Sequence, residues 1–369
     1  MDLSRRALLR RAAVGAGALL GGSLLAGCGV DVRNIRWDDD TPVPKPTPGP
    51  DELARRRAAD TAQSLLATCS AAATARPDLE GLLTVVREQH SEHLVALGVR
   101  PQQTPDPSAT ATTGSPAPVS PAASATAGSD PVGDLVARHT AGASEAMTDT
   151  GTTSGGLAVL LAQVAACRAV QARQLAGALR APVPPDPAPA TAPPPAATGA
   201  PGAGQGAAPS SGTGVSPSAQ VPSATATRSA PSLTKQAQAA LAEAIDGEHA
   251  AVYGYGVLAT RLRGAERGRA LAELANHQRI AGQLAGVYEA SGEKPPAAAP
   301  GYRLPGPITD AAQAKATAAQ LESALAVTDA ALVGHTSGEL RAVAVDLVLQ
   351  RALAAHSWGA EPTAFPGRA

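Results

Sequence analysis

Residues 241–262 read LAEAIDGEHAAVYGYGVLATRL, and this stretch carries the clearest structural pattern in the chain. Its apolar side chains recur at steps of three and four residues, the period of a helix with one buried face. Glu248 lies on the same stripe as Ile245 and Tyr255. The pattern therefore predicts a helix over about residues 233–263 that carries an acidic side chain on its buried face.

Three more helices are predicted downstream, over about residues 265–291, 310–335 and 337–358. A proline-rich connection, Pro295 to Pro307, separates the second helix from the third. Because four amphipathic helices bury their apolar stripes together, we expect an antiparallel four-helix bundle over residues 232–369.

The first half of the chain repeats this organisation. Helices are predicted over about residues 51–76, 78–98, 132–147 and 156–180, which gives an N-terminal bundle over 51–181 with an insertion at 101–130. The residues TSGGL at 153–157 resemble TSGEL at 336–340, and His90 can be aligned with His277. These matches indicate an internal duplication.

Composition separates these bundles from the segments between them. Of 369 residues only seven are aromatic, while 33 are proline and 37 are glycine. Residues 28–50 form a proline-rich tether, residues 101–130 and 182–231 are rich in Pro, Ala, Ser and Thr, and we expect none of the three to fold. No segment alternates with a period of two, so the predicted class is all-α: two antiparallel four-helix bundles joined by disordered linkers. A net charge of −1 argues against a nucleic-acid partner.

The N-terminus has the features of an exported lipoprotein. Arg5 and Arg6 resemble a twin-arginine export motif, an apolar stretch follows, and Leu25-Ala26-Gly27-Cys28 resembles a bacterial lipobox. This implies removal of residues 1–27, lipidation of Cys28, and anchoring on the outer face of the cytoplasmic membrane. The alternative is an ordinary signal peptide with a chance cysteine.

Two further cysteines, Cys69 and Cys167, lie on apolar stripes of the first and fourth helices. In an up-down-up-down bundle those helices are neighbours, and an oxidising compartment favours a disulfide between them. The alternative is two unpaired buried thiols.

The stretch EHAAVYGYG at 248–256, with His277 in the next helix, resembles the ferritin-like domain of unknown function found in actinobacterial lipoproteins. The resemblance covers residues 232–369. It implies an antiparallel four-helix bundle with a long connection between its second and third helices.

The wider ferritin-like superfamily often binds two metals through one Glu on each of two helices and Glu-x-x-His on each of the others. The corresponding residues would be Glu248, Glu273, His277 and Glu322, with iron or another divalent metal as cofactor. The fourth helix lacks Glu-x-x-His. Its nearest substitutes are Asp346, Gln350 and His356. We therefore favour a buried, hydrogen-bonded pair of Glu248 and His277 over a metal site.

A second candidate metal site lies in the N-terminal bundle. His90 and His93 are three residues apart on one helical face, and His139 lies on the stripe of the third helix. Three imidazoles suit zinc or copper. The favoured alternative is that two or more of them are solvated at the rim of the bundle, because no fourth ligand is visible.

No motif supports nucleophilic catalysis or phosphate binding. We therefore expect a non-enzymatic, membrane-anchored lipoprotein with a scaffolding or binding role in the cell envelope, whose partner is an envelope protein or a small ligand. The first alternative is ferritin-like metal capture or oxidation. The second is an adaptor whose grooves hold a peptide or lipid.

Overall fold

In a computed structural model of the chain, the structure describes residues 47–99, 131–187 and 233–368. Residues Pro48–Ala369 form one compact unit. The predicted export motif at Arg5 and Arg6, the lipidation site Cys28 and the insertion at 101–130 lie outside the described residues.

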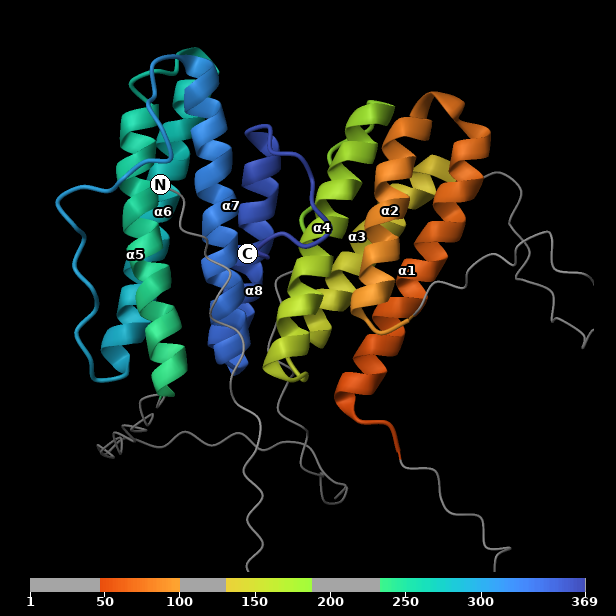
Figure 1. The fold of residues 1–369 in the computed structure, drawn as a ribbon, viewed down its shortest axis with the longest axis horizontal. Helices are drawn as coiled ribbons and strands as arrows, with labels where there is room; N and C mark the ends of the chain where they lie inside the picture. The colour runs from red at the N-terminus through yellow and green to blue at the C-terminus, as the bar shows by residue number, and fades with distance from the viewer. Residues whose placement is uncertain (1–46, 100–130, 188–232, 369) are drawn as a thin grey trace, which may run out of the picture. The chain divides into compact units, whose positions relative to one another are not determined.

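The described residues form α-helices and one short 3₁₀-helix, without a strand, which confirms the all-α prediction (Figure 1). The helices are α1 (Pro50–Ala75), α2 (Glu80–Ala96, after a 3₁₀ turn at Pro77–Leu79), α3 (Pro131–Asp149), α4 (Gly155–Leu179), α5 (Lys235–Leu258), α6 (Gly264–Ala290), α7 (Ala311–His335) and α8 (Gly338–Ser357).

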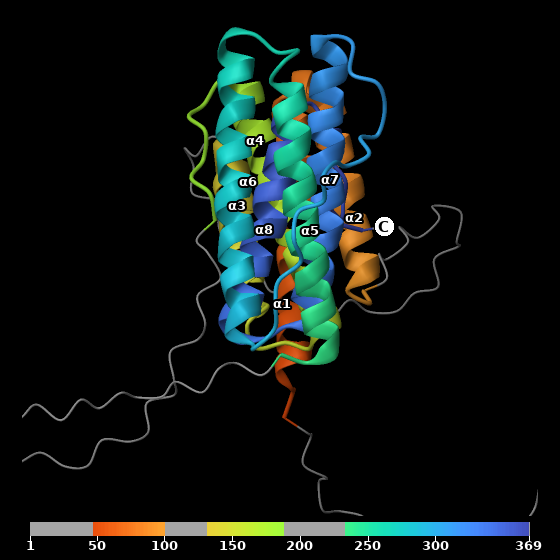
Figure 2. The same ribbon diagram turned by 90° about the vertical axis from the view of Figure 1, so that its left-hand side faces the viewer.

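The C-terminal bundle consists of α5 to α8, and α5 packs against both α6 and α7 while α7 packs against α8. The end of α5, the starts of α6 and α7 and the end of α8 share one apolar cluster, which includes Leu258, Ala270, Ala314 and Trp358. Because α6 and α7 start at the same end, the connection between them runs the length of the bundle (Figure 1, Figure 2). The side chain of Asp310 caps α7 by accepting a hydrogen bond from the backbone of Gln313.

The N-terminal bundle has the same topology. Helix α1 packs against α2 and α3, and α3 packs against α4. The starts of α2 and α3 again meet at one end, where Leu79, Leu83 and Leu135 share an apolar cluster. The expected up-down-up-down neighbourhood of the first and fourth helices is therefore wrong. Helices α1 and α4 lie diagonally and meet only through side chains in the bundle interior.

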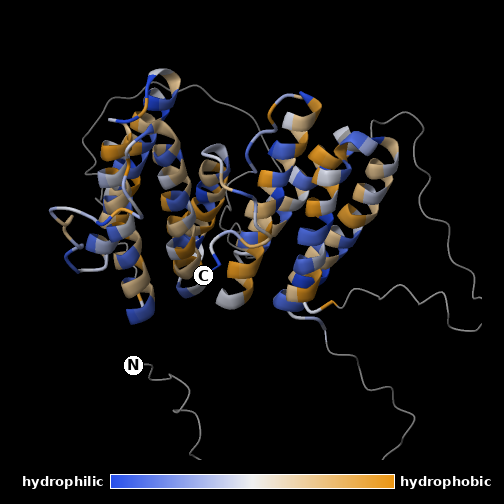
Figure 3. Cartoon of the chain, turned by 45° about the horizontal axis from the view of Figure 1, so that its top comes forward, coloured by the Kyte–Doolittle hydropathy of each residue, from blue (hydrophilic) through white to orange (hydrophobic). Residues whose placement is uncertain are grey.

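The two bundles pack against each other along α4, which contacts α7 and α8. The largest apolar cluster that the bundles share includes residues from each of α3 to α8. Figure 3 shows that hydrophobic and hydrophilic residues alternate along the helices. By length and hydropathy α4 resembles a membrane span, but 78% of its most apolar window is buried, as in a core helix. Arg341 of α8 completes the contact by donating to the carbonyls of Thr150 and Thr153.

The segment after α8 crosses from the C-terminal bundle to the N-terminal one. The Gln89 side chain donates to the carbonyl oxygen of Pro362 at 3.0 Å. Phe365 packs in a small cluster with Ala364 and with Val164 of α4. Residues 360–368 therefore join both bundles, and we call them the C-terminal strap.

Two adjacent glycines at the start of α4 give a matched test of how closely the bundles approach. A Cβ atom on Gly155 would lie 2.1 Å from the carbonyl oxygen of Gly334 in α7, whereas one on Gly156 would meet nothing within 4 Å. We expect Gly155→Ala to lower the free energy of unfolding by roughly 1–3 kcal/mol, because backbone must move. Gly156→Ala should be neutral or slightly stabilising.

Urea unfolding of both variants measures this difference, and limited proteolysis reports loosening between the bundles. Equal stabilities of the two variants would contradict the close packing of α4 on α7.

Candidate functional site

A cluster of charged side chains occupies the centre of the C-terminal bundle, with every member at most 1% exposed. All four helices contribute to it. The members are Glu248 of α5, His277 of α6, Glu322 and Asp329 of α7, and Arg351 of α8. Burying this many charges is costly unless each is paired, so the pairing defines what the site can do.

The His277 ring lies between two carboxylates. Its Nδ1 is 2.7 Å from Oε2 of Glu248, and its Nε2 is 3.1 Å from Oε1 of Glu322. Burial alone would lower the pKa of His277, but the hydrogen bonds to Glu248 and then to Glu322 outweigh it and raise the pKa. The ring therefore favours the protonated form, in which both nitrogens donate. The predicted pair of Glu248 and His277 is present, and Glu322 extends it.

Tyr255 completes the contacts of Glu322. Its hydroxyl donates to Oε1 of Glu322 at 2.5 Å, and its ring stacks on His277 with centroids 5.2 Å apart. Burial would raise the pKa of the Glu322 carboxyl, but the His277 hydrogen bond and the Arg351 charge lower it below its usual range. Glu322 is therefore held as a carboxylate.

Arg351 supplies the positive charge at the centre of the cluster. Its guanidinium contacts Oε1 of Glu248, lies 3.6 Å from Oε2 of Glu322, and places Nε 3.3 Å from Oδ2 of Asp329. Burial would lower the pKa of Arg351, but Glu248, Asp329 and Glu322 together raise it. Arg351 is thus a fixed cation shared by three acidic residues.

Asp329 is the second acid that α7 contributes to the cluster. Burial raises its pKa to about 7, although Arg351 opposes the shift. Its second oxygen, Oδ1, has no hydrogen-bond partner among the described residues. A protonated Asp329 leaves Glu248 and Glu322 to balance the charges of Arg351 and His277.

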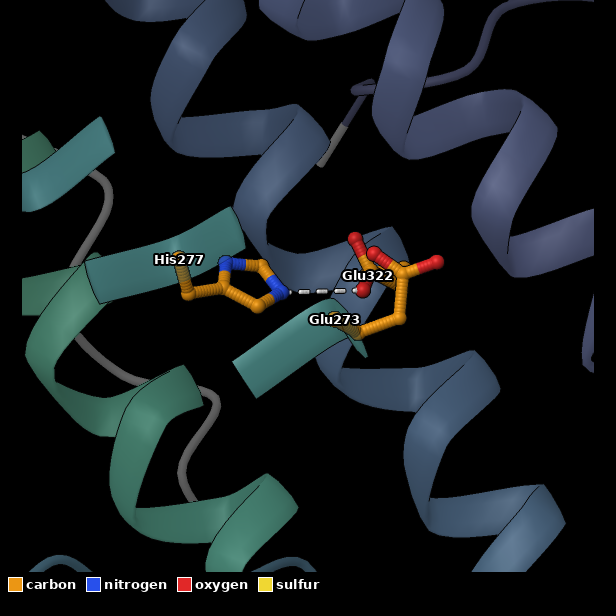
Figure 4. Close-up of side chains that lie close together, drawn as sticks. All are labelled: Glu273, His277 and Glu322. Atoms are coloured by element: carbon orange, nitrogen blue, oxygen red, sulfur yellow. Dashed lines mark hydrogen bonds and ion pairs between the residues drawn. The ribbon is translucent and has the colours of Figure 1, made fainter. Parts of the chain in front are cut away.

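Glu273 lies at the mouth of the cluster. It is half-buried and lines a cavity of about 210 Å³ together with Asn276, Gln350 and Arg351. Burial, and then the charge of Glu322, raise the pKa of its carboxyl. One ligand atom from each of Glu273, His277 and Glu322 lies within 4.8 Å of the others, and Figure 4 shows their side chains converging.

The sequence-predicted metal ligands therefore divide into two sets. Glu273, His277 and Glu322 form the one group of close ligand atoms found among the described residues. Glu248 instead contacts His277 and Arg351. The ferritin-type pair of metals does not fit these residues, because the Arg351 guanidinium lies where the carboxylates of α5 and α7 converge.

The substitutes expected on α8 lie elsewhere. Gln350 donates to Asp346 at 2.5 Å and lines the cavity at the mouth of the cluster without joining the buried contacts, and His356 lines a cavity beside the C-terminal strap. Arg351 was not predicted as a site residue. The repeat could have found it, because Arg351 follows Thr336 by the same 15 residues (351 − 336) that separate Arg168 from Thr153 (168 − 153).

The three histidines of the N-terminal bundle are fully buried, so the expectation that they are solvated at its rim is wrong. Nδ1 of His139 lies 2.7 Å from the carbonyl oxygen of Leu135 and must donate to it. Its neutral Nε2 then accepts from Nε2 of His90 at 3.0 Å, while Nε2 of His93 donates to the carbonyl of Ala364 at 2.7 Å. His90, His93 and His139 do not bring one ligand atom each within 4.8 Å of the others, as Glu273, His277 and Glu322 do.

These imidazoles are held neutral. Burial lowers the pKa of His93 to about 3 and that of His139 to about 4, and it also lowers the pKa of His90. The neighbouring cation is Arg168, which is itself buried and donates to the carbonyl oxygens of Gly142 and Ala58 at 3.0 and 2.9 Å. No carboxylate contacts Arg168 among the described residues, and burial lowers its pKa to about 10.

The two cysteines are buried and free, so the predicted disulfide between Cys69 and Cys167 is not formed. Cys69 packs in the cluster that contains Leu175 of α4. Leu175 lies eight residues beyond Cys167, a rise of about 12 Å along a helix, whereas a disulfide needs Cα atoms within about 7 Å. The Cys167 thiol instead contacts the side-chain oxygen of Gln89. The alternative of two unpaired buried thiols describes the structure.

The neutral histidines predict a pH dependence of stability. The pKa of His93 is about 3 and that of His139 about 4 in the folded chain, against roughly 6.5 when unfolded. The unfolded state then binds more protons, so the free energy of unfolding falls as the pH drops below about 6.5. From about pH 7 to about pH 5 the loss should be roughly 2 kcal/mol for each such histidine.

Urea unfolding over this pH range measures the effect, and His93→Gln should flatten it. An unchanged slope in that variant would show that His93 is not held neutral.

Comparison with known proteins gives one family and no activity. Residues 240–369 match the model of a family described as a domain of unknown function (DUF4439). No curated protein matches the chain. One similar structure is that of a conserved hypothetical protein, rv2844, from Mycobacterium tuberculosis, with 29% identity and a TM-score of 0.33. The match covers 34% of this chain and 96% of that one. The C-terminal bundle, which holds the charged cluster, is thus the part of the chain that matches the DUF4439 family.

Proposed function

We propose that the chain is an extracytoplasmic lipoprotein, anchored through Cys28, whose ferritin-like helical body serves as a non-catalytic scaffold or binding module in the cell envelope. The lipobox-like residues before Cys28 and the motif at Arg5 and Arg6 support the extracytoplasmic, lipid-anchored location. The partner is an envelope protein or a small ligand.

The observation that carries the non-catalytic assignment is the position of Arg351. A buried guanidinium already neutralises Glu248 and Glu322 and holds Asp329. The cluster then needs no added cation, and its contacts connect all four helices of the bundle. Such a cluster fixes the register of the four helices.

A binding role is supported by surface cavities outside the cluster. A cavity of about 660 Å³ lies at the end of the C-terminal bundle where α5 and α8 begin. Leu233, Leu284, Val287 and Leu340 are among its lining residues. This volume lies in the range of small-molecule sites, and an apolar lining suits an apolar ligand.

A second candidate function is the capture of one divalent cation by Glu273, His277 and Glu322. The convergence of their ligand atoms within 4.8 Å favours it. In that arrangement Glu248 would hold Nδ1 of His277 and leave Nε2 for the cation, as carboxylates do for many metal-binding histidines.

The membrane anchor is tested by fractionation. We expect the wild-type chain in the membrane fraction, carrying metabolically incorporated fatty acid, and Cys28→Ala in the soluble extracytoplasmic fraction, because acyl chains supply the anchoring energy. Retention of Cys28→Ala in the membrane, with its signal peptide removed, would contradict lipid anchoring at this residue.

Elemental analysis separates the two functions. Because Arg351 neutralises the cluster, we expect the purified mature chain to contain no stoichiometric iron, zinc or manganese, even after incubation with each metal. One metal per chain that is lost in Glu273→Gln would instead establish cation capture. Asp346→Asn, outside the cluster, is the matched control.

A further inference from the structure

The two bundles place the same residue types at their centres. Counted from the matching residues Thr153 and Thr336, Arg168 aligns with Arg351, since both follow by 15 residues (168 − 153 and 351 − 336). Both arginines are at most 1% exposed, and both belong to the fourth helix of their bundle.

The second and third helices match in the same way. His139 precedes Thr153 by 14 residues (153 − 139), and Glu322 precedes Thr336 by 14 (336 − 322). In each bundle Nε2 of the second-helix histidine contacts this residue: His90 contacts His139 at 3.0 Å, and His277 contacts Glu322 at 3.1 Å. The duplication predicted from short sequence matches therefore extends to the buried polar centre.

The bundles differ in the acids around the arginine. In the C-terminal bundle Arg351 contacts Glu248, Glu322 and Asp329. In the N-terminal bundle Arg168 donates to backbone carbonyl oxygens. The arginine is common to both centres, and the carboxylates belong to one.

Carboxylate oxygens and an imidazole that converge in a helical bundle are ligands that divalent transition metals accept. Glu273, His277 and Glu322 supply that set, and Arg351 on the fourth helix balances the charge of Glu322 and of the neighbouring Glu248 as a cation would. A guanidinium balances carboxylates with five fixed N–H donors, so it replaces a metal charge without offering a coordination site.

We propose that Arg351 is a built-in substitute for a metal ion, and that the acidic centre of the C-terminal bundle is a latent divalent-cation site which this arginine blocks. The inference rests on the proposed function, in which the wild-type chain holds no metal. It adds the reason why no metal binds. Arg168 contacts no carboxylate among the described residues, so it blocks no such site.

A surface cavity beside Arg351 would give a cation access to this site. Arg351 lines the cavity of about 210 Å³ that also exposes Glu273 and Gln350. Arg351 therefore both lines the cavity, beside Glu273, and contacts the buried acids Glu248 and Glu322. Its removal frees Glu322, whose ligand atom lies within 4.8 Å of those of Glu273 and His277, for a cation that enters from the cavity.

The test replaces each arginine by methionine, which keeps most of the side-chain volume and removes the charge. Mn²⁺ and Zn²⁺ are added separately to the mature chain, and binding is followed by equilibrium dialysis and by the melting temperature. We expect Arg351→Met to bind either cation at least about tenfold more tightly than the wild type and to melt higher in its presence. Arg168→Met, the matched control, should lose stability and gain no cation affinity.

Two further variants keep the proposal falsifiable if Arg351→Met is poorly folded. Arg351→Lys retains the positive charge, so it should fold and gain no affinity. The double variant Arg351→Met with Glu322→Gln should lose the gained affinity. If Arg351→Met folds only when a cation is added, that dependence itself supports the proposal.

Failure of this proposal differs from failure of the proposed function. A metal-free wild type with a folded Arg351→Met that gains no affinity overturns the latent site and leaves the scaffold function intact. Tight stoichiometric metal in the wild type overturns both. Equal gains in Arg351→Met and Arg168→Met would show that the acids play no part and would also overturn the proposal.

Discussion

The contact between Arg351 and three buried acids is the constraint on which the C-terminal bundle depends. It draws one or more side chains from each of α5, α6, α7 and α8, either directly or through His277. Loss of one partner from such a network leaves an uncompensated buried charge, which costs about 3–5 kcal/mol. The register of the four helices is therefore fixed by charge as well as by the shape of the apolar core. Sliding one helix along another would separate these charged partners.

The N-terminal bundle also has to pair the polar groups at its centre, and it does so with neutral partners. Its histidines are kept unprotonated by burial, and Arg168 is paired with helix carbonyls instead of acids. Gly142 is part of this solution. A Cβ atom there would lie 2.8 Å from the Thr61 side chain and 3.3 Å from the Arg168 guanidinium, so only glycine lets the carbonyl approach without displacement. Two copies of one fold thus bury an arginine by different means.

The helices and the long connections were predictable because amphipathic periodicity and proline content are local properties. The pairing of Glu248 with His277 was predictable for a similar reason, since both lie on buried stripes. Arg351 was not predicted, because an arginine beside a buried stripe is usually placed at the surface. The prediction of a disulfide was wrong because an apolar stripe does not show which helices lie diagonally. Nor does it show how far two residues are offset along the bundle axis. The burial of His93 depends on a carbonyl 271 residues away, which no local pattern encodes.

The C-terminal strap affects when the N-terminal bundle can make all of its hydrogen bonds during synthesis. His93 finds its acceptor on Ala364, and Gln89 finds its acceptor on Pro362. Both acceptors follow all eight described helices in the chain. The N-terminal bundle emerges first from the ribosome, and these two side chains of its second helix gain their acceptors only after the strap has been made. The final packing of that bundle therefore waits for synthesis of the strap.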